Sequence, residues 1–98
     1  MNQEPVVAGV AWYDSFQWTL LRKVAADPEV LHDSFQDWEA SATEALNGIV
    51  AEGGTVVRVP VNVADLVSWC RRKRVPNTSS SRAQYVAGLM HRGTGKRL

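Results

Sequence analysis

Few side chains in this chain have the types and spacing that chemistry needs. The soft or borderline metal ligands are His32, His91 and Cys70. None of them lies at the short, regular spacing by which a zinc site gathers its ligands. The sequence therefore predicts no metal centre and no cofactor.

Cys70 is also the candidate nucleophile, and His32 beside Asp33 is the candidate base. Cys70 falls on the apolar stripe of a predicted helix, near its C-terminal end, where the helix dipole disfavours a thiolate. Adjacent residues on a helix point about 100° apart, so His32 and Asp33 are poorly placed to act together. No glycine-rich phosphate loop follows a predicted strand. The sequence thus indicates a protein that is not an enzyme.

Acidic side chains are concentrated in the first half of the chain and basic side chains in the second half. Residues 1–54 hold nine acidic and two basic residues, a net charge of −7, whereas residues 55–98 hold nine basic and one acidic residue, a net charge of +8. The halves either attract each other in the fold or face different partners. The candidate surface for a protein partner or for nucleic acid comprises Arg58, Arg71, Arg72, Lys73, Arg74 and Arg82.

A protein partner is favoured over nucleic acid, because the overall charge is only +1 and the acidic half weakens the field that nucleic acid would feel. That partner would engage either the acidic helix predicted at 33–51 or the basic run at 71–74. The low overall charge also favours the alternative to any partner, in which the basic run balances its own helix dipole and pairs with the acidic helix at 33–51.

Aromatic residues precede the first predicted helix. Trp12 and Tyr13 are the candidate aromatic contact for a partner, and the structural alternative is a hydrophobic staple over the helix start. Trp18, Trp38 and Trp69 lie close to apolar helix positions, which predicts packing in or beside the core.

Length and composition limit the class of protein. Ninety-eight residues with an apolar share of 45% make one domain with a single core. The longest apolar run, Val6 to Trp12, is far shorter than the ~20 residues that cross a bilayer, and Met1–Pro5 lacks the basic start of a secretion signal. A lone cysteine suits a reducing compartment. We expect a cytoplasmic protein with no membrane association.

Apolar periodicity and capping residues predict four helices and one strand. In the first helix, Phe16, Leu20 and Val24 are expected on the buried face. The strand needs a pairing partner, because isolated backbone groups would go unsatisfied: either residues 6–11 or the same strand of a second copy. The predicted elements are a helix from Asp14 or Ser15 to about Ala26, a helix from Asp33 to Ala51, a strand at 55–61, a helix from Asn62 to about Lys73, and a helix from Ser79–Ser81 to Gly93.

The predicted fold class is therefore α+β, mainly helical, in the order helix–helix–strand–helix–helix. We expect a loosely ordered N-terminus at 1–8, one globular domain at 9–92 and a flexible tail at 93–98. The protein is expected to be a monomer or a homodimer, depending on how the strand is paired.

Three aromatic motifs carry a resemblance to small uncharacterised bacterial proteins, and it implies no activity. They are Trp12 to Trp18, Phe35-Gln36-Asp37-Trp38 and Leu66-Val67-Ser68-Trp69-Cys70.

Residues 55–91 also resemble, in part, the ribbon-helix-helix family of dimeric DNA-binding regulators. The stretches that match are Val56-Val57-Arg58-Val59-Pro60, Val63-Ala64-Asp65-Leu66-Val67 and Ser79-Ser80-Ser81-Arg82-Ala83-Gln84-Tyr85. This resemblance implies Val56 and Arg58 in the major groove and a phosphate near Ser80. Our favoured hypothesis is a protein-interaction or regulatory protein, and the alternative is a DNA-binding transcriptional regulator of this family.

Overall fold

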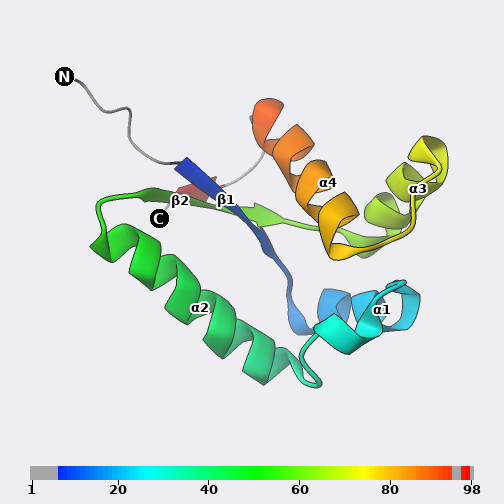
Figure 1. Ribbon diagram of the computed structural model, residues 1–98, viewed down its shortest axis with the longest axis horizontal. Coiled ribbons are helices and arrows are strands. Elements are labelled where there is room, and N and C mark those ends of the chain that lie inside the picture. Colours follow the sequence, from blue (N-terminus) through cyan, green and yellow to red (C-terminus); the bar gives the residue numbers. More distant parts are fainter. Residues whose placement is uncertain (1–6, 94–95, 98) are drawn as a thin grey trace.

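The computed structural model describes residues 7–93 and 96–97 of the chain. The fold is α+β and mainly helical, as predicted. Figure 1 shows two long strands with helices around them. The elements are β1 (Val7–Trp12), α1 (Ser15–Val24), a 3₁₀ helix η1 (Pro28–Val30), α2 (Phe35–Ala51), β2 (Thr55–Pro60), α3 (Val63–Lys73), α4 (Ser79–His91) and β3 (Lys96–Arg97).

The sheet has the strand order β1-β2-β3. β1 runs parallel to β2, with Val7 opposite Thr55 and Trp12 opposite Pro60. β3 runs antiparallel to β2 on the other edge. Two pairing partners were predicted for the strand at 55–61: residues 6–11, or the same strand of a second copy. The structure shows the first of these, because β1 pairs with β2. β2 thus has a neighbour at both edges.

Both chain ends were predicted to be loose. Residues 1–6 lie outside the described part, and β1 begins at Val7, so residues 7 and 8 belong to the sheet. The backbone of 96–97 pairs with β2, within the segment predicted to be a flexible tail. Residues 94, 95 and 98 lie outside the described part, and the mobility of the tail stays a prediction.

The two faces of the sheet carry different helices (Figure 1). Successive side chains of a strand point to opposite faces. Val57 and Val59 of β2 pack with the core of α3 and α4, which includes Leu66 and Val86. Val56 therefore points to the other face, where α2 packs against β2.

Each α-helix begins at a side chain that caps it. Asp14 and Asn62 accept hydrogen bonds from the N–H groups three residues on, as predicted. The cap of α2 is Ser34 rather than Asp33, and α2 starts at residue 35. The cap of α4 is Thr78, one residue before the predicted serines. The sequence thus located each helix start to within about two residues.

The prediction for the buried face of α1 was wrong. Phe16 is 66% exposed and Val24 is 43% exposed, whereas Trp18 and Leu21 are almost fully buried. The Trp18 ring stacks on Trp38, with centroids 5.1 Å apart and planes 22° apart. Burying the larger aromatic surface decides the rotation of the helix, so Phe16 and Val24 face solvent while Leu20 packs at the edge of the core.

Candidate functional site

The basic end of α3, defined as Arg71–Arg74, is the part of the predicted surface that lies exposed together. It comprises the last turn of the helix and its C-cap. The structure has ion pairs between Arg22 and Asp33 and between Arg82 and Asp27. Within residues 7–93, no ion pair involves the basic end of α3. These charges are therefore open to a partner.

Arg74 ends α3 in a left-handed conformation, with φ 57° and ψ 44°. Its N–H donates to the Arg71 carbonyl, and the N–H of Val75 donates to the Cys70 carbonyl. This is the Schellman motif, in which glycine is the usual residue at the left-handed position. A residue with a β-carbon costs roughly 1 kcal/mol there. The chain thus keeps a basic side chain where glycine would fit better.

The acidic side chains of α2 do not neutralise the basic end of α3. Asp37, Glu39 and Glu44 are exposed along α2. Figure 1 shows α2 on one side of the strands and α3 on the other, with the C-terminal end of α3 pointing away from α2. Charges that are exposed in water interact little beyond a Debye length of about 8 Å at physiological salt. For α2 and the basic end of α3, the segregation of charge along the sequence is thus also a segregation in space, whereas Asp27 and Arg82 join the two halves.

Arg82 does not belong to this surface, and its prediction as a surface residue was wrong. Its side chain lies in the interior, where only 7% of the residue is exposed. Two of its nitrogens contact the two carboxylate oxygens of Asp27, at 2.9 and 3.2 Å. It also donates to the carbonyl and side-chain oxygens of Asn77 and to the Ser79 hydroxyl. These bonds from both terminal nitrogens compensate for the burial of the Arg82 charge.

Asp27 joins the end of α1 to the start of α4. Besides Arg82, it accepts hydrogen bonds from the N–H and hydroxyl of Ser79 at the first turn of α4. Burial raises its pKa, but the bonds from Arg82 and Ser79 and the charge of Arg82 outweigh this, so the pKa of Asp27 lies below its usual range. An internal carboxylate therefore occupies the helix terminus where a phosphate near Ser80 was expected.

Arg58 also lies apart from the basic end of α3. Its guanidinium lies over the Trp12 ring, 4.4 Å from the centroid, and the residue is half-buried. Its Nε is buried and has no hydrogen-bond partner within the described residues. Val56 is 1% exposed. In this fold, neither residue stands out from the sheet as a base-reading side chain would.

Tyr13 was a candidate aromatic contact for a partner, together with Trp12. The structure contradicts this for Tyr13, because its side chain is buried. Its ring packs edge-on against Trp18 at 5.7 Å and against Trp38 at 5.4 Å. Because Asp14 caps α1, Tyr13 precedes the cap and Trp18 is four residues inside it. This is the geometry of a hydrophobic staple, the structural alternative that the sequence offered. Trp12 is half-buried against Trp38.

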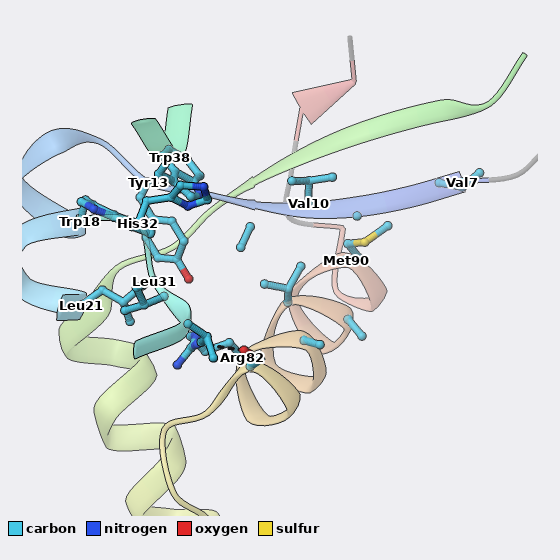
Figure 2. Close-up of a pocket in the computed structure, with 17 residues that line it drawn as sticks. Val7, Val10, Tyr13, Trp18, Leu21, Leu31, His32, Trp38, Arg82 and Met90 are labelled. Atoms are coloured by element: carbon cyan, nitrogen blue, oxygen red, sulfur yellow. Dashed lines mark hydrogen bonds between the residues drawn. The ribbon is translucent and has the colours of Figure 1, made fainter. Parts of the chain in front are cut away.

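A groove of about 660 Å³ that was not predicted from the sequence lies between β1 and α4. Figure 2 shows side chains from both elements and from the segment after α1 around it. Small residues on α4, Ala83 and Ala87, line its wall. Gly9 of β1 lets Met90 approach, because a β-carbon there would overlap the Met90 sulfur. The small residues at four-residue spacing on α4 are the signal that could have pointed to a hollow.

Burial raises the pKa of the Cys70 thiol, despite the opposing charge of Arg82. Cys70 therefore stays a thiol packed in the core at neutral pH. Within residues 7–93, no three His, Cys, Asp or Glu side chains come together as metal ligands would. None of the described helices has both the length and the apolar character that crossing a bilayer requires.

Comparison of the chain with protein-family models, with curated proteins and with solved structures finds no match. The resemblances to uncharacterised bacterial proteins and to the ribbon-helix-helix family stay predictions.

Proposed function

We propose that this protein is a non-enzymatic interaction protein of the cytoplasm, and that the basic end of α3 binds an acidic segment of a partner protein. The observation that carries the proposal is that four consecutive basic side chains are exposed and, within the described residues, without an ion pair. The conformation of Arg74 supports it, because a strained backbone that retains a charged side chain is typical of a functional position.

An acidic protein is favoured over nucleic acid. The cluster covers one helix end, and the exposed carboxylates of α2 give the same molecule a negative region. Such a division of charge orients a partner that is itself divided, whereas a uniform polyanion would be repelled by one end. β1 pairs with β2 along one edge and β3 pairs with Val57 and Arg58 on the other, so a second copy would have to displace one of them to form the strand pair of the DNA-binding alternative.

The test uses two defined probes, a poly-glutamate peptide and a 20-base-pair DNA duplex. The variant Arg71→Glu/Arg72→Glu reverses two charges of the cluster. Lys23→Glu/Arg92→Glu is the matched control, since it changes the net charge equally at two exposed residues outside the cluster. Binding is measured by calorimetry at low and at physiological salt.

We expect the wild type and the control to bind the peptide, and the cluster variant to bind it at least about tenfold more weakly, since close charge pairs across an interface are worth about 1.5 kcal/mol or more each. Equal peptide binding by both variants would remove the basic end of α3 as the binding surface. Tighter binding to the duplex than to the peptide by the wild type would favour the DNA-binding alternative. Partners captured from lysate by wild type and lost with the cluster variant then supply candidates for the natural ligand.

A further inference from the structure

The groove between β1 and α4 is a second candidate site, independent of the basic end of α3. Its volume of about 660 Å³ lies within the range of about 300–1,000 Å³ typical of small-molecule pockets. Its lining is mainly apolar and includes the tryptophans Trp18 and Trp38 and the aliphatic residues Val86 and Met90. Figure 2 shows these side chains around one open space. Size and lining suit a molecule with an apolar body.

One hydroxyl faces the groove without a hydrogen-bond partner from the described residues. Tyr13 is 5% exposed and lines the groove. Within residues 7–93, the structure gives its hydroxyl no hydrogen bond, and Figure 2 draws the hydroxyl oxygen on the groove side of the ring, toward Arg82. A hydroxyl that faces the groove without a protein partner is free to donate to an acceptor on a ligand, as it would to water.

The guanidinium that lines the groove is already paired. Arg82 lines it, but its terminal nitrogens are bonded to Asp27, Asn77 and Ser79. An anion entering the groove would lose its hydration and gain no unpaired counter-charge. Burial raises the pKa of Tyr13 to about 12 despite the opposing Arg82, so its hydroxyl keeps its proton at neutral pH and acts as a donor.

We infer that the groove binds a small, uncharged, mainly aliphatic molecule with one carbonyl oxygen, which accepts a hydrogen bond from the Tyr13 hydroxyl. The apolar body lies along Val86, Ala87 and Met90 of α4. This gives the protein a ligand site in addition to its protein-binding surface.

The experiment titrates the full chain, labelled with ¹⁵N, with 2-octanone and separately with octanoate, which has the same number of carbons and a negative charge. Amide shifts of Gly9 and Val86 report on the groove. Ala87→Phe fills the groove from an exposed helix position, and Ala40→Phe on α2 is the matched control at an exposed position outside it. Tyr13→Phe removes only the donor.

We expect 2-octanone to give saturable shifts at Gly9 and Val86 in the wild type and in the Ala40→Phe variant. Ala87→Phe should weaken this binding at least tenfold, and Tyr13→Phe by about three- to tenfold, the value of one hydrogen bond. Octanoate should bind more weakly than 2-octanone. The absence of saturable shifts, or binding unaffected by Ala87→Phe, overturns the site. If octanoate binds as tightly as 2-octanone, or if the Tyr13→Phe variant binds 2-octanone as tightly as wild type does, the chemistry assigned to the ligand is overturned.

Discussion

Arg82 and Arg74 are close in sequence and have opposite environments. Arg82 is 7% exposed and donates to Asp27, Asn77 and Ser79. Arg74 is exposed, has no ion pair within the described residues, and holds its backbone in the left-handed region. A carboxylate within reach of both terminal nitrogens, and not the charge itself, decides which arginine belongs to the interior. Arg82 stabilises the fold, whereas Arg74 destabilises it slightly through its backbone conformation.

The largest expected effect comes from breaking the buried pair. Asp27→Ala leaves Arg82 buried without its counter-charge and removes the acceptor at the first turn of α4. Losing one partner of a buried ion pair leaves an uncompensated charge, so we expect unfolding free energy to fall by about 3 kcal/mol or more. Urea-induced unfolding followed by tryptophan fluorescence measures this loss.

Asp33→Ala is the control, because it breaks an ion pair whose carboxylate is 97% exposed and should cost less than about 1 kcal/mol. The lowered pKa of Asp27 gives the sign of the pH effect. Its stabilisation is present above the ordinary value of 3.8 and is lost as pH falls through the lower folded-state pKa. If Asp27→Ala costs no more than Asp33→Ala, then Arg82 does not depend on its partner and the contrast with Arg74 fails.

The next largest effect concerns Tyr13, which lies close enough to Arg82 for the charge of Arg82 to affect its pKa. It tests whether water is excluded from this part of the interior. Tyr13 ionises near pH 10.0 when unfolded and near pH 12 when folded, because burial opposes the charge. The unfolded state therefore loses its proton first, and stability falls as pH rises from 10 to 12. A shift of that size corresponds to about 2–3 kcal/mol. The measurement is the urea midpoint of wild type against pH.

Tyr13→Phe cannot ionise at this position, so the stability difference between wild type and variant should change by that amount across the same range. Tyr85 and Cys70 also have raised pKa values, but they are present in both proteins and cancel. A constant difference between the two proteins up to pH 12 would mean that water reaches the Tyr13 hydroxyl freely.

Local signals in the sequence predicted much of the fold. The capping side chains Asp14 and Asn62, and the β-branched run that forms β2, act within a few residues of themselves, so their positions could be read directly. The partner of β2 could be narrowed to two candidates, because an isolated strand leaves its backbone groups unsatisfied.

The remainder depends on contacts between distant parts of the chain. Asp27 and Arg82 are far apart in sequence, so counting charges placed Arg82 with the exposed cluster. Phe16 has the spacing of a buried face, but the stacking of Trp18 on Trp38 sets the rotation of α1. The groove lies between several segments, and the alanines at four-residue spacing on α4 indicate only one of its walls.

The smallest effect has the opposite sign and concerns Arg74. Glycine adopts φ 57° without the steric cost of a β-carbon, so Arg74→Gly should raise the unfolding free energy by about 1 kcal/mol. Arg74→Ala removes the charge and keeps the strain, so it should give no such gain. Urea unfolding separates the two, and both variants should bind the poly-glutamate peptide more weakly than wild type.

Stabilisation by alanine as well as by glycine would mean that the cost of Arg74 comes from charge repulsion at the helix end. A gain confined to glycine, together with weaker binding in both, would mean that Arg74 occupies a glycine position because its side chain is used.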